Sequence, residues 1–245
     1  MDNRYNNKTK QYKLQFSPKT YFGEEDFMVT SCNEAAYNMI KMWPHWPHFA
    51  ASIYGSKSSG KTHLAHIWAA QIQKSLPHPV AVPFIQAQQV NMKNVNKLAN
   101  ENHYLVIENI NADINEEAFF HLYNFFNLPD RAVLFTSEAP LSKLPLKLPD
   151  LRSRLNTIPN IEILQPDDVM LTALIAKLFN DRQIIIGQDI LEYILNHTER
   201  SFDFVTRLIA EIDDISWTYG RAVTIPIVKE AFNAISKNQQ LELFI

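Results

Sequence analysis

The segment "GSKSSGKT", from Gly55 to Thr62, decides the fold expected of this chain. It satisfies the pattern G-x-x-x-x-G-K-[ST] at every required position, with a short strand pattern before it and a helical pattern after it. Glycines let the backbone curl until its N–H groups point inward at phosphate oxygens, and the N-terminus of the following helix favours an anion. The segment therefore predicts a phosphate-binding loop, with an ordinary Gly/Ser-rich turn as the structural alternative.

The loop supplies the chemical groups that nucleotide binding needs. Lys61 provides a positive charge for the β- and γ-phosphates, and the hydroxyl of Thr62 can bind Mg²⁺. The predicted cofactor-binding residues are Gly55, Ser56, Lys57, Ser58, Ser59, Gly60, Lys61 and Thr62. We therefore predict that the chain binds a nucleotide, ADP or ATP, with Mg²⁺ as an accompanying ion.

A phosphate-binding loop needs a second element, an acidic residue at the end of a neighbouring strand, and one follows the apolar segment "YLVI". Glu108 comes directly after it, at the position where P-loop proteins place the acid that holds the metal, and we predict that Thr62 and Glu108 share Mg²⁺. Asp is usual at this Walker B position, and Glu is one methylene longer. Asn109 follows, where many ATPases place a second acid that helps to position water. The sequence thus predicts nucleotide binding but does not favour fast hydrolysis.

Two further segments carry residues with two interpretations each. "LFTSEAP" places Thr136 and Ser137 at the end of a strand, either as polar sensors of the γ-phosphate or as an ST-turn. "LPDLRSRL" holds Arg152 and Arg154 just before the last strand. An arginine here could neutralise charge on the nucleotide of a neighbouring molecule, or it could form an ordinary surface ion pair.

Apolar strand patterns alternate with helical patterns over the first two thirds of the chain, which predicts a parallel five-stranded sheet flanked by helices. Strands are expected at residues 50–55, 79–85, 103–110, 131–138 and 160–164, and helices at 33–43, 61–76 and 116–128. After Pro166 the pattern changes to helical spacing alone, at residues 167–183, 187–198, 201–220 and 224–235. The predicted fold class is α/β, followed by a small all-α lid domain.

The domain boundaries follow from these patterns. We expect a flexible arm at residues 1–20, a nucleotide-binding α/β domain at 21–165, a helical lid at 166–236 and a tail at 237–245. The arm is polar and holds the only local basic excess of the chain.

Composition restricts the classes of partner. The net charge is −3, from 23 basic and 26 acidic residues, which does not favour direct sequence-specific DNA binding. No run approaches ~18 uncharged apolar residues, so no membrane span or membrane partner is expected. The single cysteine, Cys32, cannot form an internal disulfide, which suits the cytoplasm, and it is expected to be a small buried side chain.

Two other features are interpreted as structural. His63 and His66 lie three residues apart on the helix after the loop, but no third ligand stands at metal spacing, so we do not expect a zinc site. The aromatic run "AFFHLYNFF" at residues 118–126 has helical spacing and is expected to form core or an interface.

Both ends of the chain carry short apolar peptides. "QYKLQF" occupies residues 11–16 and "QLELF" occupies residues 240–244. Each could pack on its own domain. Each could instead order on a partner, burying Leu and an aromatic ring in an apolar groove and anchoring itself through the Gln amide.

Together these residues resemble a known family. "EDFMVTSCNEAA", "IYGSKSSGKTHLAHIWA", "LVIENI", "FTSEAP" and "LPDLRSRL" occur in the order seen in DnaA, the bacterial replication initiator. The chain ends after the lid pattern, without room for a helix-turn-helix DNA-binding domain, and it has an N-terminal Q-x-x-L-x-[LF] element. In this it is similar to the DnaA-related regulatory inactivator family (Hda or HdaA), which are AAA+ P-loop proteins.

The resemblance implies a function. Members of the family bind ADP, dock on the DNA polymerase sliding clamp and stimulate hydrolysis of ATP bound to DnaA, which prevents re-initiation of replication. Arg154 matches the family's arginine finger and would act on ATP held by a DnaA protomer. The peptide anchors implied for the clamp are Gln11, Leu14 and Phe16 at one end and Gln240, Leu241, Leu243 and Phe244 at the other.

The chain departs from the family pattern at two positions, Glu108 and the lid arginine that senses phosphates. An apolar residue stands near the latter position, which leaves Arg200 or Arg207 as substitutes. Two alternative functions therefore stay open: a self-sufficient ATPase or helicase-loader-like motor, and a clamp adaptor with a vestigial nucleotide site. The sequence also leaves open whether the free chain is a monomer or a homodimer.

Overall fold

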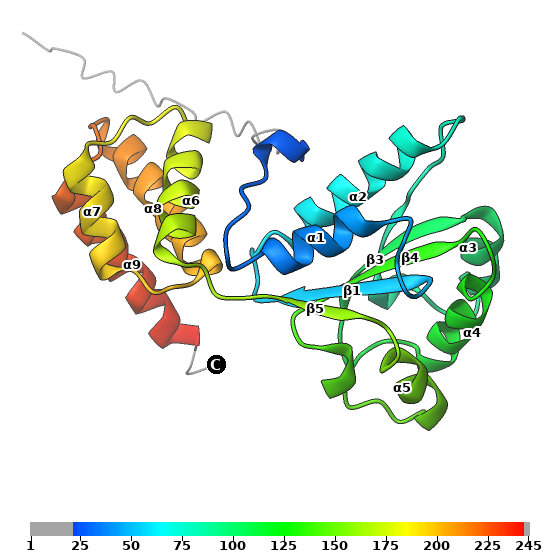
Figure 1. Cartoon of the computed structure of the whole chain (residues 1–245). Coiled ribbons are helices and arrows are strands. Elements are labelled where there is room, and N and C mark those ends of the chain that lie inside the picture. Colours follow the sequence, from blue (N-terminus) through cyan, green and yellow to red (C-terminus); the bar gives the residue numbers. More distant parts are fainter. Residues whose placement is uncertain (1–21, 243–245) are drawn as a thin grey trace, which may run out of the picture.

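The computed structural model describes residues 22–242, and the side chains of residues 22–237. Figure 1 shows an α/β domain with the helical lid beside it. No helix in the described range is both long enough and apolar enough to cross a membrane. This arrangement follows the change of pattern that the sequence shows after Pro166.

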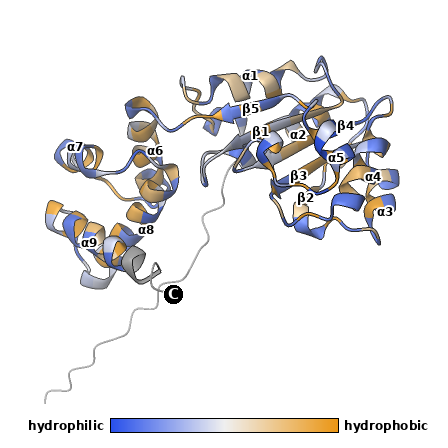
Figure 2. Ribbon diagram, turned by 90° about the horizontal axis from the view of Figure 1, so that it is seen from below, coloured by the Kyte–Doolittle hydropathy of each residue, from blue (hydrophilic) through white to orange (hydrophobic). Residues whose placement is uncertain are grey.

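The α/β domain is built on one five-stranded parallel sheet with the strand order β2-β3-β4-β1-β5. The strands are β1 (Ala50–Gly55), β2 (Phe84–Gln86), β3 (Tyr104–Ile110), β4 (Ala132–Ser137) and β5 (Asn160–Ile163). The central strands are hydrophobic along nearly their whole length because both faces of the sheet are covered (Figure 2). The predicted parallel five-stranded sheet is confirmed.

Helices cover the two faces of the sheet and form two cores. α1 (Glu34–Met42) and α2 (Lys61–Ser75) pack on one face. α3 (Val95–Glu101), α4 (Glu116–Phe126) and α5 (Pro149–Leu155) pack on the other. Successive residues of a strand serve different cores: in β3, Leu105 and Ile107 join the second core while Val106 joins the first.

Two elements differ from their expected extent. The strand expected at 79–85 is reduced to Phe84–Gln86, because prolines at 79 and 83 have no N–H to donate to a neighbouring strand. β2 is accordingly a short edge strand, and its pairing begins where Val106 N donates to the carbonyl of Pro83. Helix α3 was not predicted, since "VNKLANE" has two asparagines and only one clear apolar pair.

The lid contains the four expected helices around a third core. They are α6 (Asp168–Asp181), α7 (Gln188–His197), α8 (Phe202–Tyr219) and α9 (Ile225–Glu242). Asp167 and Ser201 cap α6 and α8 by accepting hydrogen bonds from backbone N–H groups, and Gly220 ends α8 in the left-handed conformation. The backbone of α9 runs six residues past position 236, through residues 237–242, because no Gly or Pro interrupts it.

The lid packs against the α/β domain beside the phosphate loop. Met170 and Phe202 are buried in the core formed by α1 and α2. Ser31 donates a hydrogen bond to Asp167 (2.7 Å), and Lys177 donates one to the carbonyl of Asp26 (3.0 Å). The segment from Asp26 to Ser31 is therefore joined directly to the first lid helix and its N-cap.

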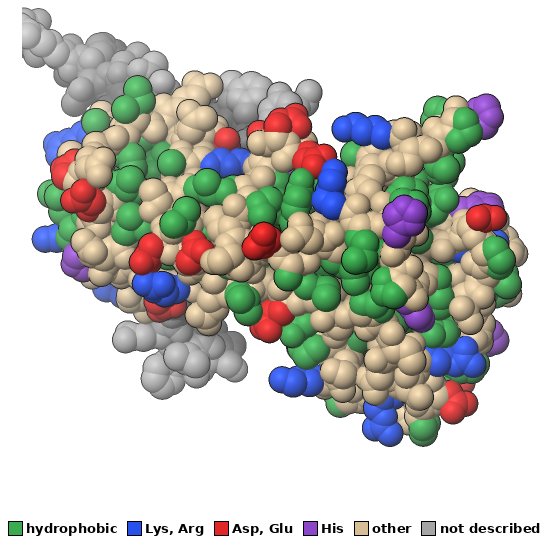
Figure 3. Space-filling model, viewed as in Figure 1, with side chains coloured by type: hydrophobic (Ala, Val, Ile, Leu, Met, Phe, Trp, Pro, Cys, Tyr) green, Lys and Arg blue, Asp and Glu red, His purple; other side chains and the backbone are tan. Residues whose placement is uncertain are grey.

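Cys32 lies at this junction and is 4% exposed, which confirms that it is a small buried side chain. Its carbonyl accepts a hydrogen bond from the backbone N–H of Leu164, which leads into the lid. The surface of the described residues shows basic and acidic side chains interspersed rather than gathered into one basic face in the view of Figure 3.

Candidate functional site

The phosphate loop connects the end of β1 to the start of α2, as the motif requires. Ser58 (φ 61°) and Gly60 (φ 94°) both adopt positive φ, which curls the backbone between the two elements. At Gly55 a Cβ atom would lie 2.8 Å from the carbonyl oxygen of Ile163 in β5, so only glycine fits there. The loop is thus held against the sheet at its first residue and turned back at its sixth.

Lys61 is buried within this loop. Its ammonium group donates hydrogen bonds to the carbonyl oxygens of Gly55 (2.8 Å) and Ser56 (2.7 Å). Burial lowers the pKa of Lys61, and the charge of Glu138 offsets this in part. A buried cation is costly unless an anion compensates it, and a phosphate at the loop would do so.

A second polar group of the loop has an unused hydrogen-bonding capacity. The hydroxyl of Ser59 is buried and has no hydrogen-bond partner among the described residues. Buried hydroxyls normally have a partner. Ser59, Lys61 and the N-terminus of α2 therefore fit a phosphate group.

Glu108 connects the loop to the neighbouring strands. The hydroxyl of Thr62 donates to one carboxylate oxygen of Glu108 (2.7 Å), although the two residues are 46 positions apart. The amide of Gln86 donates to the other carboxylate oxygen (3.1 Å). The structure thus brings the two residues expected to share Mg²⁺ into direct contact. No group of three or more His, Cys, Asp or Glu that could hold a metal ion is present in the described residues.

Asn109 adopts a positive φ of 58° immediately after Glu108. Its backbone N–H donates to the hydroxyl of Thr136 (3.2 Å), and its side-chain amide donates to Gln86 (2.8 Å). Thr136 and Ser137 are both buried, and the hydroxyl of Ser137 donates to the carbonyl of Ala139 (2.7 Å). Thr136 therefore lies next to the acidic segment, and the sensor role of the pair stays a prediction.

Residues 22–27, here called the strap, cross the first turns of α2. His63 donates from Nε2 to the carbonyl of Gly23 (2.7 Å), and the ring of Phe22 stacks on His66 with centroids 4.2 Å apart. Phe27 meets His63 edge-on, and its ring would lie 3.3 Å from a Cβ atom at Gly60. The two histidines thus hold the strap against the phosphate loop, a role that helical spacing alone does not reveal.

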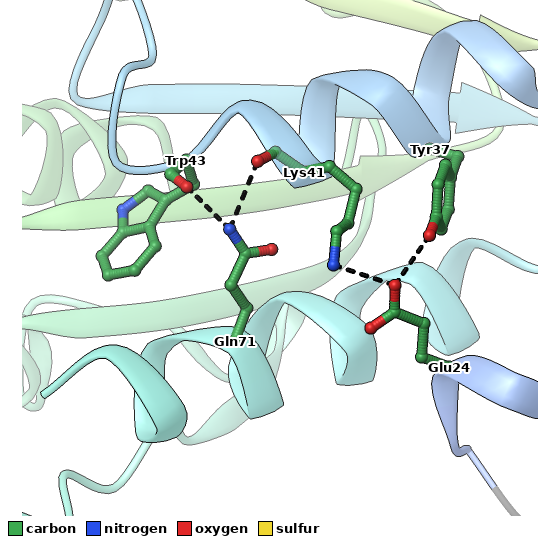
Figure 4. A network of polar contacts seen from close by, with 5 residues as sticks. All are labelled: Glu24, Tyr37, Lys41, Trp43 and Gln71. Carbon is green, nitrogen blue, oxygen red and sulfur yellow. Dashed lines mark hydrogen bonds and ion pairs between the residues drawn. The ribbon is translucent and has the colours of Figure 1, made fainter.

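The strap is also fixed to α1 (Figure 4). One carboxylate oxygen of Glu24 accepts hydrogen bonds from Tyr37 (2.7 Å) and Lys41 (2.8 Å). The contact with Lys41, followed by that with Tyr37, lowers the pKa of Glu24. Gln71 of α2 joins the same region by donating to the carbonyl of Trp43 (2.6 Å).

Arg154 lies on α5 and packs against α4. Its guanidinium group stands over the rings of Phe120 (4.6 Å from the centroid) and Tyr123 (5.2 Å), and it donates to the side-chain oxygen of Asn124. None of these three partners carries a charge, and Arg154 has no ion pair among the described residues. Arg152 is exposed. The aromatic run of α4 thus contributes to the core through Phe119 and Phe126. Phe120 and Tyr123 of the same run, here called the aromatic bed, contact Arg154.

Arg154 and the phosphate loop lie at opposite ends of β1. The guanidinium group of Arg154 lies over the ring of Tyr123, whose hydroxyl is 3.2 Å from Nε2 of His48. Nδ1 of His48 accepts a hydrogen bond from the backbone N–H of Ala50, where β1 begins. The phosphate loop follows Gly55, where β1 ends. A strand of this length spans about 17 Å. Arg154 is therefore remote from the phosphate loop of its own chain.

The two lid arginines considered as phosphate sensors have carboxylate partners in the lid. Arg200 pairs with Asp168 (2.9 Å) and Arg207 pairs with Asp203 one turn earlier in α8 (2.9 Å). The choice between them stays open.

The peptides expected to bind the clamp are largely beyond the described part of the chain. Gln11, Leu14, Phe16, Leu243 and Phe244 lie outside the described residues. Gln240 and Leu241 lie within the backbone of α9. Their clamp-binding role stays a prediction.

The lid and the whole chain are similar to known proteins. Residues 167–232 match the family model described as "Hda, lid domain". The chromosomal replication initiator protein DnaA of Clavibacter sepedonicus is 26% identical over 198 residues, which cover 74% of this chain and 41% of that protein. The chain therefore spans less than half the length of this relative.

Solved structures share the fold. Domain III of the Thermotoga maritima replication initiation protein DnaA superposes with a TM-score of 0.75 at 17% identity, covering 87% of this chain and 96% of that domain. The AMPPCP-bound DnaA from Aquifex aeolicus gives a TM-score of 0.65 at 18% identity, and the match covers 93% of this chain and 72% of that chain. These likenesses confirm the AAA+ fold and, with the lid match, the predicted resemblance to DnaA-related, Hda-like proteins.

Proposed function

We propose that this protein regulates replication initiation by holding ADP in its phosphate loop and presenting Arg154 to ATP bound by DnaA. The observation that carries the proposal is the separation of Arg154 from the phosphate loop by the length of β1. One nucleotide cannot contact both sites in one chain. The arginine is thus available only to a nucleotide on another molecule.

Nucleotide binding is supported by the chemistry of the loop. Lys61 is a buried cation whose hydrogen bonds go only to carbonyls of the loop, and Ser59 carries a buried hydroxyl without a partner in the described residues. A diphosphate would satisfy both groups. Thr62 and Glu108 would hold Mg²⁺, which when bound neutralises phosphate charge. Related folds have been solved with AMPPCP and with ADP.

Slow turnover by the chain itself is expected from Asn109. A carboxylate at this position could orient or deprotonate a water molecule, whereas a neutral amide cannot act as a general base. The Asn109 amide is moreover engaged with Gln86. The site therefore suits a nucleotide that is retained rather than hydrolysed quickly.

The proposed action of Arg154 is electrostatic. Hydrolysis of ATP develops charge on the transferred phosphoryl group, and an arginine supplied by a second molecule lowers the barrier, with effects of about 10³–10⁵ on the rate in other systems. Arg154 lies on neutral groups rather than on a carboxylate, so its charge is not already compensated within the described residues. We propose DnaA as the partner because the sequence and fold are related to DnaA.

We further propose that the terminal peptides dock on the sliding clamp, which would hold the protein near replicating DNA. Peptide binding of this kind is weak for one site and increases when a ring offers repeated pockets. Both peptides begin with Gln and carry Leu three residues later; Phe follows that Leu by two residues in the first peptide and by one in the second.

The test is hydrolysis of radiolabelled ATP bound to DnaA, followed with and without this protein and with and without a clamp loaded on DNA. We expect acceleration that requires both the protein and the loaded clamp. If ATP on DnaA is lost at the same rate in all four mixtures, the regulatory function is excluded. If acceleration needs the protein but not the clamp, only the docking of the peptides is excluded.

A further inference from the structure

Gln86 occupies a position that no motif of the sequence identifies. It is the last residue of β2 and is paired with Glu108 in the parallel register of β2 and β3. Its side chain uses both ends of its amide: Nε2 donates to Glu108 (3.1 Å), and Oε1 accepts from the side chain of Asn109 (2.8 Å). One neutral side chain thus connects the two residues that define the metal-binding end of β3.

Glu108 is held by two donors from two different elements. Thr62 of α2 binds one carboxylate oxygen, and Gln86 of β2 binds the other. The Glu side chain has one more rotatable bond than the Asp that usually occupies this position, so it needs an additional contact to keep one orientation. Gln86 provides that contact. Its length suits Glu108, because the strands are in register and both side chains start from the same level.

We propose that Gln86 is a positioning residue for Mg²⁺ at the nucleotide site, which rests on the nucleotide binding proposed above. Residues that hydrogen-bond a metal ligand fix its orientation, and their loss typically costs about 10–100-fold in metal affinity. Gln86 fixes the carboxylate that would hold Mg²⁺ beside the Thr62 hydroxyl. It therefore sets how strongly Mg²⁺ tightens the binding of ADP.

Asn109 is fixed by the same side chain and by its own backbone. Its N–H bonds to Thr136, its carbonyl accepts from Gln88 (3.2 Å), and its amide donates to Gln86. Gln88 therefore supports the same backbone without touching Glu108 in the described contacts. This difference supplies a matched control, since Gln88 is an exposed glutamine two residues from Gln86.

The experiment measures the Kd of ADP by calorimetry in Mg²⁺ and again in excess EDTA. It compares the full chain with Gln86→Met, which keeps the shape but removes both hydrogen bonds, and with Gln88→Met. We expect Mg²⁺ to tighten ADP binding by the wild type. Gln86→Met should lose about 10-fold of that enhancement while its Kd in EDTA stays near the wild-type value. Gln88→Met should keep the full enhancement.

A second variant guards against loss of folding. Gln86→Asn stays polar but is one methylene shorter, so it cannot reach Glu108 and Asn109 together. We expect the same loss of Mg²⁺ enhancement, with a melting temperature that shows the protein to be folded.

Three results for the variants would overturn the proposal. They are an undiminished Mg²⁺ enhancement in Gln86→Met and Gln86→Asn, an equal loss in Gln88→Met, and an equal weakening of ADP binding with and without Mg²⁺. A wild type that binds ADP with the same Kd in Mg²⁺ and EDTA would also overturn it. A wild type that does not bind ADP in either condition would instead remove the nucleotide site, and the role of Gln86 with it.

Discussion

At the scale of single residues, the phosphate loop is organised around a buried cation. Lys61 contacts two loop carbonyls, and burial lowers the pKa of its ammonium group. The exposed Lys57 belongs to the same loop but contributes only its backbone N–H to the predicted cradle. Substituting each lysine in turn therefore distinguishes the effect of the buried Lys61 ammonium group from the effect of the net charge of the loop.

Replacing Lys61 should remove the stabilisation by ADP. A ligand at 100 times its Kd stabilises a folded protein by about 2.7 kcal/mol, which for a chain of this size raises the melting temperature by several degrees. We expect this rise for the wild type and for Lys57→Ala, and no rise for Lys61→Ala, in thermal melts at millimolar ADP. A rise of equal size in Lys61→Ala would contradict the site.

At the scale of elements, the strap contacts both α2 and the lid. Phe27 packs on His63 and beside Gly60, while Asp26 accepts a hydrogen bond from Lys177 of α6. The strap therefore limits movement of the phosphate loop on one side and of the lid on the other. Loosening it should affect both stability and nucleotide affinity.

Truncation of Phe27 tests this link. Phe27→Ala removes a partly buried ring and should lower the free energy of unfolding by about 1–3 kcal/mol. It should also weaken ADP binding, because the ring no longer supports the loop at Gly60. Trp46→Ala is the control: that ring stacks on Trp68 in the same core and should cost stability without weakening ADP binding. Equal ADP affinities for the two variants would show that the strap is not coupled to the loop.

The histidines under the strap predict a dependence of stability on pH. Burial lowers the pKa of His63 and of His66 below the ordinary value near 6.5. The unfolded chain therefore binds more protons than the folded chain just below that pH, so the stabilisation is complete above it and is lost as the pH falls. We expect the free energy of urea unfolding to fall from pH 7 to pH 5.5, and to fall less in His63→Gln, which keeps a donor for Gly23. The same slope in both proteins would contradict this.

Some elements could be predicted from sequence because their signals are local. The phosphate loop is fixed by residue types at set spacings, and β3 and β4 by continuous apolar runs between turns. β2 is shorter than its apolar residues predict, because Pro79 and Pro83 have no N–H to pair with a neighbouring strand. Helix α3 was missed because its asparagines conceal the apolar positions Val95 and Ala99, which tertiary packing buries.

Parts of the site could not be predicted because they depend on contacts between distant segments. Glu108 could be assigned from its place after a strand, but the hydrogen bond from Gln86 exists only because β2 and β3 pair in register. The spacing of His63 and His66 argues against a metal site, but no local pattern indicates that Phe22 and Gly23 contact these histidines. The uncharged surroundings of Arg154 likewise exist only because α4 and α5 pack together.

At the scale of the whole molecule, the sheet separates the two sites of the proposed function. The C-terminal end of β1 leads into the phosphate loop, and the lid lies on that side of the sheet (Figure 1). Helix α5, which contains Arg154, lies toward the N-terminal end of β1. A nucleotide held by the chain can stabilise the junction of lid and α/β domain while the arginine faces another molecule. The proposed role depends on this geometry together with the docking of the terminal peptides.

The two terminal peptides can be distinguished by paired substitutions. Leu14→Ala with Phe16→Ala should weaken binding to the sliding clamp, because each lost side chain removes apolar surface from the groove. Leu243→Ala with Phe244→Ala tests the other peptide in the same surface-immobilised clamp assay. If neither pair changes the affinity, the clamp is not the partner of these peptides.

The central claim is tested most directly by single-turnover hydrolysis of ATP on DnaA in the presence of DNA-loaded clamp. Wild type, Arg154→Ala and Arg152→Ala are compared side by side. Both arginines lie on α5, but only Arg154 occupies the aromatic bed. We predict that wild type and Arg152→Ala accelerate hydrolysis equally, whereas Arg154→Ala binds the clamp normally and gives no acceleration. Full acceleration by Arg154→Ala would contradict the account.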